Sequence, residues 1–375
     1  MKNILVFYGG KSTEHDISII TALQAVKNIN KSIYNVIPIY CYFGEFLTSK
    51  AACDIKSYID FDYKKWNNVY FSNGYMFEKK LRTVSVKIDC ALLCNHGGGG
   101  ENGCLQGYLE TVNIPYTSAN TLASSICMDK VASKEFFKAI GMDIVDYVEI
   151  CKDDYLTNKK SLIYYIESML SFPIIVKPAD LGSSIGIKTA KDIESLKDAV
   201  KTAFGFSDRI ICEKALTDFT EFNCAGINSN LGLFISDIEK PVGWQEFLSF
   251  DDKYLNNGKM SNQKSEFPAN IDEELAKKIQ SCTEKLIKNL KIDGVVRCDY
   301  LYSNQTEKLY INEINTIPGS LAYYLFKNQF GFQELLNILI EDAIFRFDKR
   351  SHNSFSYKTD VLLNYKKGCN KLAVK

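Results

Sequence analysis

The chain has 375 residues, and its 45 lysine and arginine residues balance 45 aspartate and glutamate residues. This length exceeds what one hydrophobic core usually supports, so two or three domains are expected. The balanced charge gives no basic surface for nucleic acid or an anionic membrane, and no stretch of sequence is long and apolar enough to span a bilayer. We therefore expect a cytoplasmic protein whose partners are small molecules.

Twelve cysteines are scattered along the chain without a C-x-x-C pair. The closest group is Cys90, Cys94 and Cys104, for which His96 is the one nearby candidate as a fourth zinc ligand. The spacing favours reduced, mostly buried thiols over a zinc site.

Strand and helix patterns alternate in the first part of the chain. Apolar runs predict strands at 4–8, 36–42 and 89–94, and helical spacing predicts a helix at 18–29. Such alternation is typical of a parallel α/β sheet, so we expect an N-terminal α/β domain over residues 1–118.

The middle of the chain reads as a small α+β domain over residues 119–213. A helix is expected at 121–140, with Gly141 as its C-terminal stop. The remaining patterns predict strands at 144–150, 173–177 and 210–213 and helices at 160–170 and 193–203.

Residues 214–350 are expected to form a third domain, followed by a polar surface extension at 351–375. The polar stretch 247–264 is too long for a tight turn and is a candidate mobile lid. Helices are predicted at 272–290 and 332–345, with a β-hairpin formed by 295–302 and 309–316 between them.

The hairpin carries a candidate metal site. Asp299 lies on its first strand, and Glu313 and Asn315 lie on its second strand. Because side chains alternate along a strand, folding back through 304–308 brings these oxygen ligands together, with Arg297 beside them. Carboxylate and amide oxygens suit Mg²⁺. The alternative is a solvated polar face of the hairpin.

A nucleotide would have to be held beside such a metal. Lys130, Lys177 and the loop 182–184 can offer cations and backbone N–H groups to phosphates. The segment from Glu213 to Leu216 follows a strand and could contact an adenine through its backbone, while Glu221 could accept from ribose hydroxyls. Taken one at a time, each of these residues also fits an ordinary solvated role.

Five segments in order carry a resemblance to a known family. They are GGKSTEHDIS at 9–18, HGGGGENGCLQG at 96–107, SSICMDKVASK at 124–134, IIVKPADLGSSIG at 174–186, and RCDY with NEINTIPGS across 297–320. From Asn3 to about Ile340 the chain resembles the D-alanine:D-alanine ligases of the ATP-grasp superfamily. The resemblance implies a three-domain ATP-grasp architecture, ATP and two Mg²⁺ ions with Mn²⁺ as an alternative, and a homodimer.

The resemblance also implies a role for individual residues. The residues that would bind the nucleotide are Lys130, Lys177, Glu213, Leu216, Glu221, Phe247 and Lys253. The residues that would bind the metal ions are Asp299, Glu313 and Asn315. Glu14 would meet the ammonium of the first D-alanine and form a hydrogen-bonded set with Ser183 and Tyr254. Arg297 and the N–H of Gly319 would stabilise the tetrahedral oxyanion. His96 would support the first substrate site.

The implied reaction joins two D-alanine molecules through an acyl phosphate, for peptidoglycan precursor synthesis. Two departures from the family pattern affect the substrates. Asn102 replaces the usual aspartate, and the hydroxyl that would hold the acceptor carboxylate must come from Ser320, from Tyr324 at the ungapped position, or from elsewhere. Tyr254 favours an amine acceptor. The alternatives are a ligase with a different acceptor, such as D-serine, and a non-catalytic ATP-binding relative.

Overall fold

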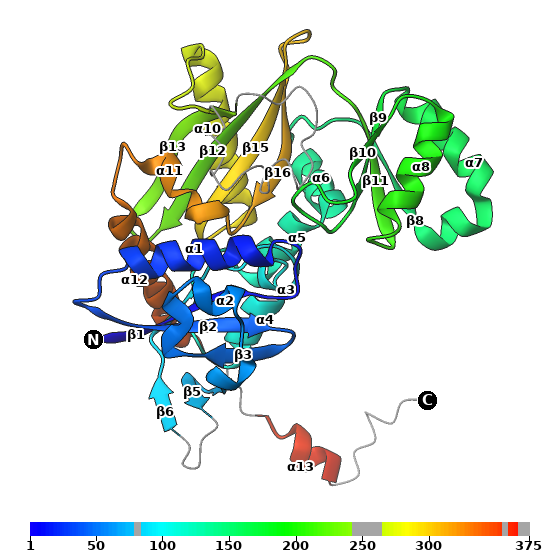
Figure 1. The fold of residues 1–375 in the computed structure, drawn as a ribbon. Helices are drawn as coiled ribbons and strands as arrows, with labels where there is room; N and C mark the ends of the chain where they lie inside the picture. Colours follow the sequence, from blue (N-terminus) through cyan, green and yellow to red (C-terminus); the bar gives the residue numbers. More distant parts are fainter. Residues whose placement is uncertain (79–83, 242–264, 355–358, 367–375) are drawn as a thin grey trace.

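Three β-sheets organise the protein in the computed structural model, which describes residues 1–78, 84–241, 265–354 and 359–366 (Figure 1). The first sheet has the order β6-β5-β4-β3-β2-β1-β7. Its strands are β1 (Lys2–Gly9), β2 (Tyr34–Tyr42), β3 (Glu45–Thr48), β4 (Asn67–Ser72), β5 (Tyr75–Glu78), β6 (Val84–Lys87) and β7 (Cys90–Leu93). The accompanying helices are α1 (His15–Asn28), η1 (Lys50–Cys53), α2 (Lys56–Ile59), η2 (Tyr63–Lys65), α3 (Gly98–Glu101) and α4 (Cys104–Thr111).

The parallel part of the first sheet consists of β1 with β2 and β7 on its two sides. These are the three strands predicted from the apolar runs, and β1 is buried along most of its length, as expected of a central parallel strand. Strands β3 to β6 extend the sheet in antiparallel fashion. Sequence reasoning did not anticipate this extension.

The second sheet is antiparallel, has the order β10-β9-β11-β8, and stands to the right in Figure 1 with helices α7 and α8 beside it. Its strands are β8 (Tyr147–Cys151), β9 (Ile174–Pro178), β10 (Lys188–Ala190) and β11 (Arg209–Lys214). The helices of this part of the chain are α5 (Thr121–Met128), α6 (Lys130–Ala139), α7 (Lys152–Leu170) and α8 (Ile193–Ala203).

The prediction of a single helix at 121–140 is wrong, because two helices, α5 and α6, meet at Asp129. The Asp129 backbone is extended, and its carboxylate accepts hydrogen bonds from the N–H groups of Val131 and Ala132 at the start of α6. This new N-terminus places Lys130 at the first position of α6. Gly141 follows α6 with a φ of +70°, as its predicted stop position requires.

The third sheet is also antiparallel and has the order β14-β13-β12-β15-β16. Its strands are β12 (Phe219–Ser229), β13 (Gly232–Pro241), β14 (Ser265–Glu266), β15 (Gly294–Ser303) and β16 (Leu309–Asn315). The helices are α10 (Glu273–Leu290), η3 (Gly319–Ala322), α11 (Tyr323–Phe326), α12 (Phe332–Ser351) and, in the predicted surface extension, α13 (Val361–Lys366).

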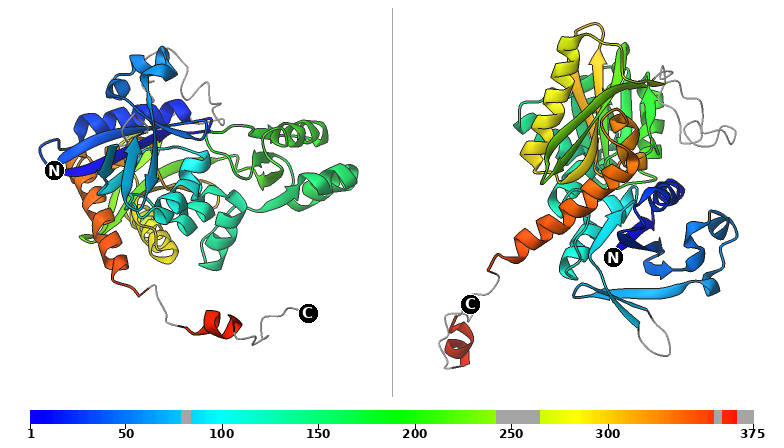
Figure 2. Two further views of the ribbon diagram at one scale, coloured as in Figure 1. Left: turned by 90° about the horizontal axis from the view of Figure 1, so that it is seen from below. Right: turned by 90° about the vertical axis from the view of Figure 1, so that its left-hand side faces the viewer.

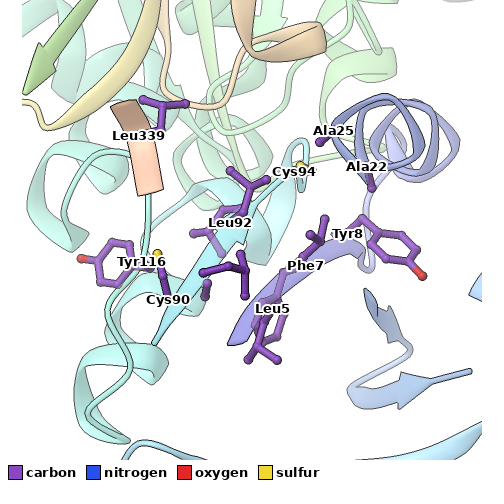
Figure 3. Close-up of a cluster of buried hydrophobic side chains, with 14 of the residues drawn as sticks. Leu5, Phe7, Tyr8, Ala22, Ala25, Cys90, Leu92, Cys94, Tyr116 and Leu339 are labelled. Atoms are coloured by element: carbon purple, nitrogen blue, oxygen red, sulfur yellow. The ribbon is translucent and has the colours of Figure 1, made fainter. Parts of the chain in front are cut away.

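Helix α12 connects the first and third sheets. It packs against β7 on one side and against β12 and β15 on the other, and it runs diagonally across the right-hand view of Figure 2. Figure 3 shows Leu339 of α12 above Leu92 and Cys90, in the core that also holds Phe7 and Leu5 of β1. The N-terminal and C-terminal parts of the chain therefore share one hydrophobic core.

Helices α5 and α6 pack against β16, and Ala123, Cys127 and Phe137 belong to the core of the third sheet. The sequence-based limits 1–118, 119–213, 214–350 and 351–375 stay a prediction. Within the described residues, no helix is long and apolar enough to cross a membrane.

Candidate active site

The predicted hairpin is formed by β15 and β16. Asp299 pairs with Glu313 across the two strands, and Arg297 pairs with Asn315. A bulge follows Asp299, where the register shifts by one residue. The alternation of side chains therefore places these four polar residues together, as the sequence pattern predicted.

Hydrogen bonds fix the polar groups of this hairpin. Arg297 donates from Nε to Asp299 Oδ1 at 2.6 Å and from Nη2 to Oδ2 at 2.7 Å, and Asn315 Nδ2 donates to Asp299 Oδ2 at 3.0 Å. The Asp299 side chain is only 4% exposed, which argues against a solvated polar face. A buried carboxylate at this position needs partners of opposite charge.

The donor set fits a divalent metal ion. Asp299 Oδ1 accepts one hydrogen bond and keeps a lone pair for a metal ion, and Glu313 adds a second carboxylate opposite to it. Because Asn315 donates through Nδ2, its carbonyl oxygen is left for another partner. Hard oxygen ligands of this kind suit Mg²⁺.

Predicted phosphate-binding lysines lie in the interior near this hairpin. Lys177 of β9 and Glu213 of β11 are both buried, and Lys177 Nζ lies 2.5 Å from Glu213 Oε2. Burial lowers the pKa of Lys130, and the negative charge of Glu313 opposes that shift. The Lys130 ammonium also donates to the Leu181 carbonyl in the loop after β9. Lys130 is therefore held close to the metal hairpin, and Lys177 lies close enough to act on the charge of Lys130.

Burial would raise the pKa of Glu213, but Lys134 and Lys177 overcome this effect and hold it at about 2. Lys134 was not singled out from the sequence. Leu216 follows β11, and Glu221 lies on β12; both side chains are half-buried.

Glu14 and Ser183 meet, although they are far apart in the sequence. Ser183 Oγ donates to Glu14 Oε1 at 2.5 Å. Two glycines leave room for the Glu14 carboxylate, since a Cβ at Gly97 would lie 2.4 Å from Glu14 Oε2 and one at Gly182 would lie 2.9 Å from it. The glycines of two predicted motifs therefore make space for the acid of a third motif.

One pocket collects residues from all three parts of the chain. Its lining includes Glu14 and Glu101 from the N-terminal part, Lys130, Ser133, Gly182 and Ser183 from the middle, and Glu313, Asn315 and Thr316 from the third sheet. An acid suited to an ammonium, a lysine suited to a phosphate and two oxygen donors suited to a metal thus face a common space.

His96 joins α1 to the loop after β16. Its Nδ1 lies 2.7 Å from the Ile317 carbonyl oxygen, and its Nε2 lies 2.8 Å from the Thr21 hydroxyl. A carbonyl only accepts, so Nδ1 carries the proton and Nε2 accepts from Thr21. Burial lowers the pKa of His96 to about 4, which keeps the ring neutral. Through these two hydrogen bonds His96 holds the loop after β16 against α1, which is a supporting role.

Glu101 was missed by sequence reasoning, although it lies within the quoted HGGGGENGCLQG motif. Its carboxylate accepts from the N–H of Gly97 and from the N–H of Ile317, each at 2.9 Å. Burial and the nearby Glu14 raise the pKa of Glu101 to about 7. The neighbouring Asn102 accepts from the Cys104 N–H at 3.1 Å at the start of α4.

The segment after β16 has an unusual backbone. Ser320, Leu321 and Ala322 have φ values of 51°, 52° and 51°, a left-handed conformation that costs about 1–2 kcal/mol per residue. The Ser320 hydroxyl donates to Gln24 Oε1 at 2.7 Å. A Cβ at Gly319 would meet no atom within 4 Å, so space is open beside it.

Tyr324 lies close to the Arg297 guanidinium, whose positive charge acts on the Tyr324 hydroxyl. Burial raises the pKa of Tyr324 to about 12, so the hydroxyl keeps its proton. Of the two hydroxyls considered from the sequence, that of Ser320 is directed to α1 and that of Tyr324 to the metal hairpin.

Three residues predicted from the sequence, Phe247, Lys253 and Tyr254, lie outside the described residues, as does the whole candidate lid at 247–264. Cys90 and Cys94 are buried and Cys104 is exposed. Across the described ranges, no three His, Cys, Asp or Glu side chains form a cluster that could hold a metal ion. The metal hairpin offers two such side chains, Asp299 and Glu313, together with the amide of Asn315.

The three sheets and the pocket between them define an enzyme of the ATP-grasp class. Family models match the description "D-ala D-ala ligase N-terminus" over residues 3–119 and "D-ala D-ala ligase C-terminus" over residues 136–341. A D-alanine–D-alanine ligase from Thermosipho africanus is 35% identical over 367 residues, which cover 96% of this chain and 98% of the relative. The chain belongs to the D-alanine–D-alanine ligase family.

Solved structures agree on the fold. The D-alanine–D-alanine ligase from Coxiella burnetii aligns with a TM-score of 0.79 at 24% identity and covers 99% of each chain. The VanG D-Ala:D-Ser ligase from Enterococcus faecalis aligns with a TM-score of 0.78 at 27% identity, covering 91% of this chain and 99% of the other. The predicted family, fold class and enzyme class are confirmed. The family implies the use of ATP, a divalent metal ion and small-molecule substrates.

Proposed function

We propose that this chain is an ATP-dependent ligase that joins two D-alanine molecules into D-alanyl-D-alanine for peptidoglycan precursor synthesis. One observation carries the proposal: the pocket in which Glu14 and Ser183 face Lys130, Glu313 and Asn315. A carboxylate–amine ligase must hold an amino acid next to a nucleotide phosphate. This pocket offers an acid for the ammonium and a lysine for the phosphate.

In the proposed reaction, ATP transfers its terminal phosphoryl group to the carboxylate oxygen of the first D-alanine, which yields ADP and an acyl phosphate. The amine of the second D-alanine attacks the acyl carbon, loses a proton, and expels inorganic phosphate. Glu14 holds the ammonium of the first D-alanine. Lys130 and Lys177 hold the phosphates, and Arg297 and the Gly319 N–H stabilise the oxyanion.

The proposal assigns the metal as Mg²⁺, bound as two ions, with Mn²⁺ as an alternative. Asp299, Glu313 and Asn315 would hold it, and their oxygen donors support this assignment. When bound, the metal neutralises negative charge on the phosphate oxygens.

Several roles in the proposal rest on the sequence resemblance. Glu213, Leu216 and Glu221 contact the nucleotide, with Phe247 near the adenine. Lys253 reaches the transferred phosphate and Tyr254 completes the set with Glu14 and Ser183. His96 and Ser320 support the substrates. The resemblance likewise supports a homodimer, and the sequence supports a location in the cytoplasm.

A second candidate keeps D-alanine as the first substrate and takes D-serine as the acceptor. It is favoured by the likeness to the D-Ala:D-Ser ligase structure and by Tyr324 beside Arg297, in the segment that departs from the family pattern. The additional hydroxyl of D-serine would need a hydrogen-bond partner at the acceptor site.

The test incubates the purified protein with Mg-ATP and D-alanine alone, with D-alanine and D-serine, or with L-alanine as a control. Dipeptides are identified by mass, and ADP is measured in parallel. D-alanyl-D-alanine formed from D-alanine alone, with stoichiometric ADP, is the expected result. A mixed dipeptide in large excess would favour the second candidate. ATP binding without turnover of any pair would eliminate both.

A further inference from the structure

A second buried lysine contacts the Glu213 carboxylate. Lys134 lies on α6, one turn after Lys130, and its side chain is 1% exposed. Its ammonium lies 3.0 Å from Glu213 Oε1, while Lys177 lies 2.5 Å from Oε2. Each oxygen of Glu213 is thus matched by one lysine. The reaction described above makes no use of Lys134.

Lys134 depends on Glu213 for its charge. Burial lowers its pKa, and the Glu213 carboxylate opposes that effect. The ring of Tyr147 lies 5.7 Å from the ammonium, and within the described residues no well-aligned hydrogen-bond acceptor is found for Lys134 Nζ. A buried ammonium is costly without a carboxylate partner, so Lys134 and Glu213 form an interdependent pair.

The arrangement has a consequence for Lys177. With one lysine beside it, a buried carboxylate would hold that lysine strongly, because opposite charges attract more in a low-dielectric interior than in water. With two lysines, Glu213 stays neutralised when one of them turns to another anion. The two lysines and the single Glu213 carboxylate together carry one net positive charge, which attracts a polyphosphate.

We propose that Lys134 is a positioning residue for the nucleotide: it holds Oε1 of Glu213, so that Lys177 can leave Oε2 and contact an ATP phosphate. This inference rests on the proposed function, in which Lys177 binds ATP. It predicts that Lys134 acts on ATP affinity only through Glu213 and leaves the D-alanine site unaffected.

The experiment compares Lys134→Met with wild type and with Lys138→Met, whose lysine lies one turn further along α6 with a side chain 64% exposed. Mg-ATP binding is measured by calorimetry, the fold is checked by circular dichroism, and KM is measured for ATP and for D-alanine. Lys134→Met should weaken ATP binding and raise KM for ATP by about tenfold or more, a loss of about 1.4 kcal/mol. KM for D-alanine should stay within about twofold, and Lys138→Met should match wild type.

A second comparison introduces Lys134→Met into Glu213→Gln. If Lys134 acts through Glu213, it should have little further effect once the carboxylate charge is removed, so ATP affinity should change by less than about twofold in this background. The double variant also tests the inference if Lys134→Met alone does not fold. It removes the charges of Lys134 and Glu213 together, so neither buried charge is left without its partner.

Two results would overturn the inference: unchanged ATP affinity in folded Lys134→Met, or an equally large loss with and without Glu213. Failure of the proposed function looks different. Wild-type protein would then bind Mg-ATP and form no dipeptide, whatever residue stands at position 134.

Discussion

Arg297 and Asp299, two residues apart on β15, face each other through two hydrogen bonds of 2.6 and 2.7 Å, one to each carboxylate oxygen. Such a bidentate pair fixes the plane of the guanidinium as well as its position. Asn315 donates to the same carboxylate from the neighbouring strand. In the proposed reaction, Asp299 therefore orients the oxyanion-stabilising arginine and also contributes an oxygen to the metal site.

Arg297→Lys tests this pairing. Lysine keeps the positive charge and loses the planar fork, so the charge is no longer aimed at the developing oxyanion. We expect kcat for dipeptide formation to fall by about 10²–10³-fold, as for other oxyanion donors. The measurement is steady-state release of ADP and dipeptide, with calorimetry for Mg-ATP.

The matched control is Arg350→Lys, since Arg350 lies at the end of α12 and is half-exposed beside Glu110. It should leave kcat unchanged. Unchanged turnover in Arg297→Lys would show that the arginine does not stabilise the transition state. A loss of ATP binding in a folded variant would instead assign it to the nucleotide site.

Glu14→Gln tests the first substrate site. The substitution keeps the shape of the side chain and removes the negative charge that faces the D-alanine ammonium in the proposed complex. We expect KM for the first D-alanine to rise by about tenfold or more, which corresponds to a charge-assisted hydrogen bond of about 1.5–3 kcal/mol. ATP affinity, measured by calorimetry, should change little.

Asp16→Asn serves as the control, because Asp16 lies two residues away on α1 with a side chain 90% exposed. Its kinetics should match those of wild type. Equal KM values for D-alanine in Glu14→Gln and wild type would remove Glu14 from the substrate site.

The metal hairpin could be predicted because its information is local. A period of two along 295–302 and 309–316 places Asp299, Glu313 and Asn315 on one face, and the short connection leaves little choice of register. The break at Asp129 could not be predicted in the same way. Apolar spacing continues through α5 and α6, and only the capping role of the Asp129 side chain ends one helix and starts the next.

Contacts between segments that are far apart in the sequence could not be predicted from the sequence pattern. Lys134 and Glu101 look like ordinary surface charges on helices, and their burial results from packing against other parts of the chain. The hydrogen bond from the Ser320 hydroxyl to Gln24 of α1 is another contact between segments that are far apart in the sequence. Glu101, Lys134 and Ser320 all lie within the segments that carry the family resemblance. Only the match of a whole segment to the family could have indicated that these residues belong to the site.

Gly97→Ala tests the space that Glu14 occupies. Gly97 has a φ of +63°, and a Cβ would lie 2.4 Å from Glu14 Oε2 and 2.6 Å from Ser12 Oγ. The added methyl group must displace the Glu14 carboxylate. We expect KM for the first D-alanine to rise by about tenfold or more and the free energy of unfolding to fall by about 1–2 kcal/mol.

Gly331→Ala is the control for adding a methyl group where neither the backbone nor a neighbour opposes it. Gly331 has a φ of −76°, and a Cβ there would meet no atom within 4 Å. Its kinetics should equal those of wild type. A Gly97→Ala enzyme with wild-type KM for D-alanine would contradict the placement of Glu14 in the substrate site.

The neutral imidazole of His96 makes stability depend on pH. Burial lowers its pKa from 6.5 in the unfolded chain to about 4 in the folded protein. The unfolded state therefore binds a proton first as the pH falls, which favours unfolding. The stabilising contribution is fully present above pH 6.5 and is lost between about pH 6.5 and pH 4, at about 1.4 kcal/mol for each pH unit.

His96→Gln removes this titration while keeping a side chain that can both donate to Ile317 and accept from Thr21. The free energy of unfolding of wild type and variant is measured by urea denaturation at pH 7, 6, 5 and 4. At pH 7 wild type should be the more stable protein. The difference should shrink by about 2–3 kcal/mol towards pH 4, because only wild type has a buried imidazole that gains a proton on unfolding. A difference that stays constant from pH 7 to pH 4 would show that His96 is not held neutral by the fold.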